Sequence, residues 1–384
     1  MVGVGAVVML FGLGSIALVK IGVHQIGHSF TQENLLGTAA APANPVTGKS
    51  IDGPINILLV GSDQRPTQTQ GGNSDTIIIG HIPASHDRMY LVSIPRDLGV
   101  RIPAFPKAHY PGGSDKINAA YAFGSRDGQG DAGGFQLLAE TIKDNFGITF
   151  NGGGIVNFSG FTDILNKLGG VTMYVDETTV SIHDGVDIKT GKPARPYHIN
   201  PNTGVPFCSG PYTFQSNPLK CALPGTRPNV YAKGIDHLTP SEALDFVRSR
   251  DGLAGTDYGR QRHQQQFIKA LLKEAYSKGL NDPLKLNSFI SSIGKALVID
   301  RGSASLEDWI FTLKGITPDS LIAIKTNDGQ TVSYDGSAGP ISGSVQGLSP
   351  DSKSLLAAVK ADKSATADNV GVFLQTHQDW AADN

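Results

Sequence analysis

The sequence predicts an α/β layered domain, because short apolar runs that suit strands alternate with amphipathic segments that suit helices. The first three runs are Ile55–Val60, Thr76–His81 and Met89–Ile94, all rich in β-branched and apolar residues. If these strands pair consecutively and antiparallel, the end of the first, the start of the second and the end of the third share one edge. Charged residues stand at these three points, so this edge is the candidate functional site.

Helical and strand patterns continue along the chain. We expect a helix starting near Asp115, helices over 134–146, 161–168, 239–250, 258–278, 284–297, 306–313 and 349–361, and strands at 154–158, 171–175 and 321–326. Thr239-Pro240-Ser241-Glu242 is a capping box with proline at the first helical position. Asp257 can cap the next helix. We interpret Gly152–Gly154 as a flexible turn, because no Gly-Lys-Ser/Thr follows it as in a phosphate loop.

The N-terminal segment has the character of a membrane anchor. Residues 2–19 carry no charge and are long enough for a transmembrane helix. A cleaved signal peptide is the alternative, and the Ala-rich residues 38–43 keep it open, although Ala17-Leu18-Val19 is a poor cleavage site. We therefore expect an anchor over 1–22, an extracytoplasmic linker over 23–53, a catalytic domain over 54–362 and a polar tail over 363–384.

Both cysteines, Cys208 and Cys221, fall in residues 180–233, a Pro/Gly/Asn-rich stretch that reads as an excursion from the core. On an anchored chain, a disulfide within this excursion is the better interpretation, and it indicates an oxidising compartment outside the cytoplasm. Free thiols in a cytosolic protein are the alternative. The spacing is not the Cys-x-x-Cys pattern of a metal site.

Composition restricts the class of partner. The net charge is −2, and no basic block or helix-turn-helix pattern is present, so we expect no nucleic-acid binding. The low charged fraction of 17% and the 47 glycines predict a loop-rich fold.

Two carboxylates lie at the expected sheet edge, Asp63 three residues after the first strand and Asp75 beside the start of the second. Mg²⁺ is typically held by one or two carboxylates together with water and substrate phosphate, and two aspartates at one edge suit that role. Asp also caps turns often, and the spacing alone fits either interpretation equally well.

Arginines form the second group of candidates, and a cluster of them beside a metal suggests a pyrophosphate ligand. The candidates are Arg65, Arg96, Arg248, Arg250, Arg260 and Arg262. At helical spacing, Arg260 lies at the edge of the apolar stripe of its helix, whereas Arg262 points to the opposite side and is expected to be a surface charge. Arg248 and Arg250 end a helix, where the helix dipole favours cations whatever their function. His263 is expected to be a structural residue.

Seven motifs in order resemble the LytR-CpsA-Psr family over about 55–278. Each motif alone is weak, but their order is specific. They are GSDQR (Gly61 to Arg65), SDT (Ser74 to Thr76), SIPRD (Ser93 to Asp97), KINAAYAFG (Lys116 to Gly124), LGGV (Leu168 to Val171), VRSR (Val247 to Arg250) and DYGRQRHQQQ (Asp257 to Gln266).

The resemblance implies a three-layer α/β/α sandwich with a central mixed β-sheet, preceded by one transmembrane helix, and a groove for a polyprenyl chain. It implies a single-pass protein of the bacterial cell membrane with its catalytic domain outside the cytoplasm. The implied activity is transfer of a glycopolymer from an undecaprenyl or decaprenyl pyrophosphate carrier to peptidoglycan, through a phosphodiester link. The implied cofactor is Mg²⁺, with Mn²⁺ as the alternative.

The family's site residues map onto this chain motif by motif. Asp63 and Asp75 match its metal-binding aspartates. The family's pyrophosphate contacts correspond to Arg65, Arg96, Arg248, Arg250 and Arg260, with Asn118 and Arg262 as further candidates. Asp97 matches the acidic residue of SIPRD and is either a general base or the residue that orients Arg96. Many relatives have arginine three residues after Arg260, where this chain has His263.

Two other functions remain open at this point. A hydrolase would use water on the same lipid pyrophosphate and would need no acceptor. A non-catalytic protein would bind the polyprenyl carrier or act as a regulator, and the lack of a basic DNA-binding element counts against a role in transcription.

Overall fold

The computed structural model describes residues 31–361 apart from 44–45, 48–49, 63–71, 157, 203–204, 251, 254, 281–288 and 290–296. The expected anchor over 1–22 and the tail over 363–384 lie outside these residues, as do Asp63 and Arg65. Of the expected linker over 23–53, only 23–30, 44–45 and 48–49 lie outside, and its residues Thr31–Gln32 form a strand that pairs with residues 298–299. Among the residues that are described, no helix is both long and apolar enough to cross a bilayer.

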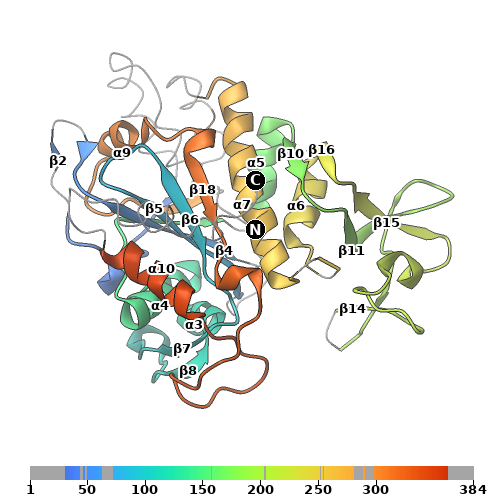
Figure 1. Ribbon diagram of the computed structural model, residues 1–384, viewed down its shortest axis with the longest axis horizontal. Helices are drawn as coiled ribbons and strands as arrows, with labels where there is room; N and C mark the ends of the chain where they lie inside the picture. Colours follow the sequence, from blue (N-terminus) through green and yellow to red (C-terminus); the bar gives the residue numbers. More distant parts are fainter. Residues whose placement is uncertain are drawn as a thin grey trace.

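A twisted sheet that includes β4, β5, β6 and β18 forms the centre of the domain (Figure 1). It has seven strands in the order β1-β17-β9-β4-β5-β6-β18. Its strands are β1 (Thr31–Gln32), β4 (Ile55–Ser62), β5 (Ser74–Ile82), β6 (Met89–Ser93), β9 (Gly152–Val156), β17 (Leu297–Asp300) and β18 (Leu321–Ile324). The three strands expected first in the chain pair consecutively and antiparallel, as predicted. β9 runs parallel to β4, and β18 runs parallel to β6, so the sheet is mixed.

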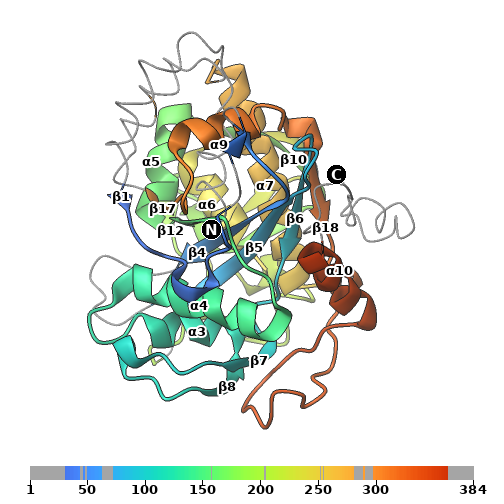
Figure 2. The same cartoon turned by 90° about the vertical axis from the view of Figure 1, so that its left-hand side faces the viewer.

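Helices cover both faces of this sheet (Figure 2). One face carries α3 (Ile117–Gly124), α4 (Gly130–Phe146) and α10 (Pro350–Ala361); the other carries α5 (Phe158–Leu168), α6 (Pro240–Arg248), α7 (Asp257–Ser277) and α9 (Leu306–Leu313). Side chains of a strand alternate between faces, so Ile57 and Leu59 enter one core and Leu58 and Val60 the other. The expected α/β/α sandwich with a mixed sheet is confirmed.

The prediction of a flexible turn at residues 152–154 is wrong, because these three glycines lie in strand β9. A Cβ on Gly152 would lie 3.1 Å from the Trp309 ring, and a Cβ on Gly153 would lie 2.6 Å from the Phe135 ring. The bare backbone therefore lets one aromatic ring pack against each face of the strand. Glycine inside a strand commonly marks such a close approach.

Two helix starts differ from the expectation, and one expected helix falls mostly outside the described residues. The helix near Asp115 begins only at Ile117, because β8 (Gly113–Lys116) first pairs with β7 (Gly99–Ile102). The segment 284–297 lies outside the described residues except for Phe289 and for Leu297, which begins β17. The N-cap of α7 is Thr256, with φ of 49° and no side-chain cap bond, and Asp257 is already inside the helix.

The excursion (residues 180–233) projects from the side of the domain (Figure 1) and contains more regular structure than expected. β11 (Thr179–Asp187), β12 (Pro193–Ala194) and β15 (Thr226–Tyr231) form a small sheet, and β13 (His198–Ile199) pairs with β14 (Pro206–Phe207). A two-stranded ribbon of β10 (Val171–Val175) and β16 (Gly234–Leu238) lies at its base. Cys208 and Cys221 form the predicted disulfide, with 5.0 Å between their Cα atoms.

Candidate active site

The antiparallel order of β4, β5 and β6 brings the expected strand ends to one rim. Ser62 at the end of β4 pairs with Ser74 at the start of β5, and the Ile94 N–H, just past β6, donates to the Ile77 carbonyl at 2.8 Å. Asp75 therefore lies at the same rim as the turn that follows β6, which carries Arg96 and Asp97. This part of the expected geometry is confirmed.

Asp75 and Arg96 form an ion pair at this rim, in which Arg96 Nη1 donates to Oδ1 of Asp75. Their side chains are 28% and 22% exposed, respectively. Burial raises the pKa of Asp75, but the neighbouring charges of Arg260 and Arg96 outweigh it and hold this pKa below its usual range. Asp75 is thus an ionised carboxylate at neutral pH.

Arg260 approaches the same aspartate from the first turn of α7. Its Nη2 lies 3.3 Å from the main-chain carbonyl oxygen of Asp75 and also donates to Oδ1 of Asp257. Arg260 is only 5% exposed, because it continues the fully buried apolar stripe of α7 that includes Phe267 and Leu271. The expected inward position of Arg260 is confirmed.

Asp97 is held between two cations. Lys116 Nζ lies 3.0 Å from Oδ1 of Asp97, and Arg96 Nε lies 3.7 Å from Oδ2. Burial lowers the pKa of Arg96, but Asp75, Asp97 and Asp257 outweigh it and raise this pKa overall. Six side chains thus alternate in charge along the rim, and we call them the charged cluster: Lys116, Asp97, Arg96, Asp75, Arg260 and Asp257.

Two donor atoms in the charged cluster make no hydrogen bond to the described residues. Nε of Arg96 and Nε of Arg260 are buried and have no hydrogen-bond partner among the described residues. A buried unsatisfied donor costs roughly 1–3 kcal/mol. An anionic ligand with several acceptor oxygens, such as a phosphate, is the chemistry that would satisfy both.

Asn118 lies beside the cluster through its main chain. Its N–H donates to the Arg96 carbonyl at 3.2 Å, the Ile117 N–H donates to the Leu98 carbonyl at 2.8 Å, and the Asn118 residue is 8% exposed. The first turn of α3 therefore holds the turn that carries Arg96 and Asp97.

Arg248 and Arg250 lie beside His183 of β11, where the excursion leaves the domain. The pKa of His183 is lowered to about 4, first by burial and then by the charges of Arg248 and Arg250. His183 is therefore neutral, and these two arginines contribute positive charge near it.

Arg262 differs from the expected solvated surface charge. It donates to Asp176 and Glu177, which follow β10, and its side chain is 23% exposed. His263 is fully buried, with Nε2 at 3.1 Å from Oδ1 of Asp176 and its ring stacked on Phe246. Burial raises the pKa of Asp176, but His263 and Arg262 lower it overall to about 2. Arg262 and His263 together fasten α7 to the end of β10.

The sequence did not predict a place in the site for Lys116, Asp257 or Asp131, and Asp257 was expected only to cap its helix. Lys116 opens one motif and Asp257 opens another, and an Asp three residues before Arg260 is the spacing of a helical ion pair. Asp131 of α4 accepts a hydrogen bond from Tyr121 Oη at 2.6 Å and another from Ser62, and burial raises its pKa overall. No short motif marks Asp131.

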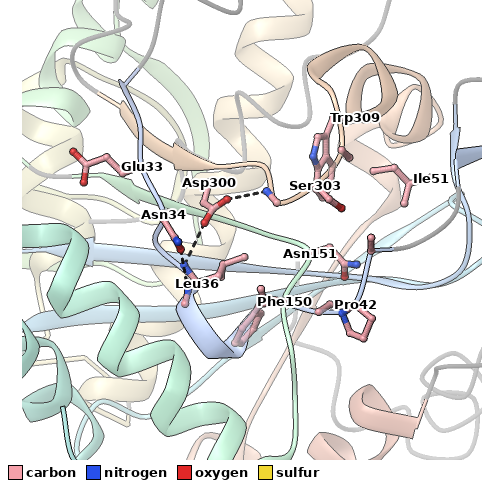
Figure 3. Close-up of a pocket in the computed structure, with 16 residues that line it drawn as sticks. Glu33, Asn34, Leu36, Pro42, Ile51, Phe150, Asn151, Asp300, Ser303 and Trp309 are labelled. Carbon is pink, nitrogen blue, oxygen red and sulfur yellow. Dashed lines mark hydrogen bonds between the residues drawn. The ribbon is translucent and has the colours of Figure 1, made fainter. Parts of the chain in front are cut away.

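A pocket of about 630 Å³ lies elsewhere, where residues 33–43 cross β17 and α9 (Figure 3). None of the candidate residues that the structure describes lines it. Asp300 in its wall accepts from the N–H groups of Leu35 and Leu36 at 2.9 and 3.2 Å, so this carboxylate holds the N-terminal segment. No group of three or more His, Cys, Asp or Glu side chains suited to a metal occurs within the described part of the chain.

The sandwich and its charged rim define an α/β protein with a candidate anion-binding site on the edge of its sheet. The chain belongs to the LytR_cpsA_psr family, whose model matches residues 28–338. The resemblance in the seven motifs is thereby confirmed.

The chain is also similar in sequence to proteins with assigned names. Over 223 residues the chain is 30% identical to the polyisoprenyl-teichoic acid–peptidoglycan teichoic acid transferase TagU of Oceanobacillus iheyensis, a match that covers 58% of this chain and 52% of the relative. TagV of Bacillus subtilis, which carries the same transferase name, is 24% identical over 315 residues, covering 81% and 65%. The matched region thus spans only about half to two thirds of these relatives.

Solved structures support the fold. A protein of Streptococcus agalactiae superimposes with a TM-score of 0.53 at 21% identity, covering 81% of this chain and 88% of that one. The structure titled "TagT bound to LIIa-WTA" gives a TM-score of 0.51 at 21% identity, covering 84% and 97%.

Proposed function

We propose that this protein transfers a glycopolymer from a polyprenyl pyrophosphate carrier to peptidoglycan and joins the two by a phosphodiester. The observation that carries the proposal is the pairing of Asp75 with Arg96 and Arg260 at the sheet rim of a chain in this family. Relatives named as polyisoprenyl-teichoic acid–peptidoglycan teichoic acid transferases support the class of donor and acceptor.

The arginines would bind the pyrophosphate. Arg96 and Arg260 each keep a buried Nε without a partner among the described residues, and phosphate oxygens are strong acceptors for such donors. Arg248 and Arg250, which lie near His183, and also Arg65 and Asn118 remain candidates for further contacts with the pyrophosphate. In phosphoryl transfer, cations fixed in place stabilise the charge that spreads over the transferred group.

The described donors fit Mg²⁺, with Mn²⁺ as the alternative, if most ligands come from substrate and water. Asp75 is ionised and its side chain is 28% exposed, so its carboxylate is accessible to a metal ion. A protein usually supplies one or two carboxylates to a Mg²⁺ site, and substrate phosphates and water supply the other ligands. Asp63 is our candidate for the second carboxylate. When bound there, the metal would neutralise pyrophosphate charge.

In the reaction, an acceptor sugar hydroxyl attacks the phosphorus atom next to the donor sugar. A new O–P bond forms, the bond from this phosphorus to the bridging oxygen breaks, and polyprenyl phosphate leaves. Asp97 is shared by Lys116 and Arg96, which supports its role in orienting Arg96 over that of a general base. The hydroxyl proton passes to water or to the departing phosphate.

We further propose that the protein is a single-pass protein of the bacterial cell membrane, with its catalytic domain outside the cytoplasm. The apolar residues 2–19 and the disulfide between Cys208 and Cys221 support this placement, because disulfides persist in oxidising compartments.

The test uses the full chain with a polyprenyl-pyrophosphate glycopolymer and peptidoglycan. We expect phosphodiester-linked product, its loss on chelation of divalent metal, and its loss in Asp75→Asn. Asp87→Asn is the matched control, because Asp87 pairs with Arg88 on an exposed surface away from the rim. Product formation by Asp75→Asn at the wild-type rate would overturn the assignment.

A further inference from the structure

Exposed apolar side chains are concentrated in one part of the molecule. Among the described residues, nine large hydrophobic side chains are exposed, and all but Val46 lie between Tyr174 and Ile235. Ile188 is 64% exposed and Leu219 is 53% exposed. This stretch is the excursion together with the β10–β16 ribbon at its base. Single exposed apolar residues are ordinary, but such a concentration marks an interaction surface.

The same segment carries a charge opposite to that of the whole chain. The excursion has six Lys and Arg against two Asp, a net charge of +4, whereas the chain as a whole has −2. All six cationic residues of the excursion are exposed. An apolar and cationic surface on an otherwise acidic protein is complementary to an anionic lipid surface.

Local geometry places these residues in groups. Ile188, Lys189 and Lys192 share one turn, closed by a 2.9 Å hydrogen bond from the Asp187 N–H to the Lys192 carbonyl. Tyr174 and Ile235 are directly paired across β10 and β16, so both exposed side chains lie on the same face of the ribbon.

The disulfide gathers a second group. Cys208 follows Phe207, which is 44% exposed, and Cys221 follows Lys220, so the bridge brings these neighbours together. Lys220 also lies 5.1 Å from the ring centroid of Tyr212. A small core that includes Tyr197 and Cys221 supports this arrangement, and the apolar and cationic side chains are therefore held on a folded unit.

We propose that the excursion docks on an anionic phospholipid surface, with its apolar side chains at the head-group boundary and its Lys and Arg side chains among the phosphates. Interfacial segments combine these two features. A polar glycan would gain nothing from the exposed side chains of Ile188 and Leu219. Docking would hold Arg248 and Arg250, which lie beside His183 at the base of the excursion, near the head-group level. Only this last consequence rests on the proposed function.

The experiment reconstitutes the full chain in vesicles of phosphatidylcholine and phosphatidylglycerol, with or without brominated acyl chains that quench tryptophan. Leu219→Trp and Ile188→Trp report on the excursion, and Ser342→Trp reports on an exposed loop elsewhere. The fluorescence of the two native tryptophans, measured on the wild-type protein, is subtracted. Apolar side chains of a docked segment lie about 5–10 Å deep, at the boundary between head groups and acyl chains. In brominated vesicles we therefore expect the two excursion tryptophans to lose about half of their fluorescence, and the Ser342→Trp signal to remain.

Reversing the charge of lysines in the excursion distinguishes docking of the excursion from an accidental closeness to the membrane imposed by the N-terminal anchor. We expect Lys189→Glu with Lys192→Glu to abolish the quenching at Leu219→Trp, whereas Lys167→Glu with Lys314→Glu, two exposed lysines outside the excursion, should leave it. Equal quenching at Leu219→Trp and Ser342→Trp, no quenching at either excursion position, or insensitivity to charge reversal would each overturn the proposal. No substrate is present, so the result does not depend on transfer activity.

Discussion

Arg260 Nη2 lies 3.3 Å from the main-chain carbonyl of Asp75, a residue 185 positions earlier in the chain. This contact joins the first turn of α7 to the start of β5. The rim therefore carries basic residues from two sources, Arg96 from the turn after β6 and Arg260 from the covering helix α7.

Replacing Arg96 by lysine should reduce transfer by about 10²-fold or more, because lysine keeps the charge but loses the planar fork that reaches Asp75 and a phosphate together. The measurement is the rate of transfer at saturating donor and acceptor. Arg88→Lys is the control, since Arg88 forms a similar pair with Asp87 on the exposed surface. Equal losses in both variants would contradict a specific role for Arg96.

The buried pair of Arg260 and Asp257 should be needed for stability as well as for activity. The two side chains are 6% and 10% exposed, so Arg260→Gln leaves a buried carboxylate without its partner and should cost about 3–5 kcal/mol. Adding Asp257→Asn should recover much of the lost free energy of unfolding, because no buried charge then remains, but it should not recover transfer. Urea unfolding of the two variants measures this, and a double variant no more stable than the single one would refute the pairing argument.

The glycines of β9 predict a packing defect on substitution. In Gly153→Ala the new Cβ would lie 2.6 Å from the Phe135 ring, and the overpacking should cost about 1–3 kcal/mol. Gly113→Ala is the control, because its Cβ meets only the Tyr110 hydroxyl at 3.1 Å. Thermal unfolding compares the two. If Phe135→Leu fails to rescue Gly153→Ala, the ring is not the cause.

Asp245 predicts a specific pH dependence of stability. Burial raises its pKa to about 6 despite hydrogen bonds from Tyr231 at 2.5 Å and Ser181 at 2.8 Å. The folded state therefore binds this proton more tightly than the unfolded state. The resulting stability is present below about pH 4 and is lost as pH rises through 6, a change on the order of 3 kcal/mol.

Asp245→Asn should remove this dependence, because the amide does not titrate. The stability difference between Asn variant and wild type should therefore grow from pH 4 to pH 7. Urea unfolding at several pH values measures it. A difference that stays constant over this range would show that Asp245 titrates normally in the folded state.

Local patterns predicted much of the fold. The β-branched runs before and after Asp75 identified β4, β5 and β6, and their consecutive pairing places Asp75 at the same rim as Arg96 and Asp97. The capping box of α6 formed as expected, with the Thr239 N–H donating to Glu242 at 2.9 Å and the Glu242 N–H donating back to Thr239 Oγ1.

Other features depend on partners far away in sequence. The glycines of β9 carry no side chains and so give no strand pattern; the Phe135 and Trp309 rings that explain them come from two different helices. Asp257 suits a cap or an ion pair equally well by residue type, and the nearby buried Arg260 decides the outcome. Arg262 faces away from the apolar stripe as expected, but the carboxylates after β10 meet it there.

The most direct test measures both products of the reaction in one assay. The full chain is given a polyprenyl-pyrophosphate glycopolymer labelled at the phosphorus next to the sugar, with and without peptidoglycan. Our account predicts that the label enters peptidoglycan, that polyprenyl monophosphate is released in equal amount, and that both require the acceptor. Release of labelled sugar phosphate without peptidoglycan, at the same rate as with it, would contradict the account and identify a hydrolase.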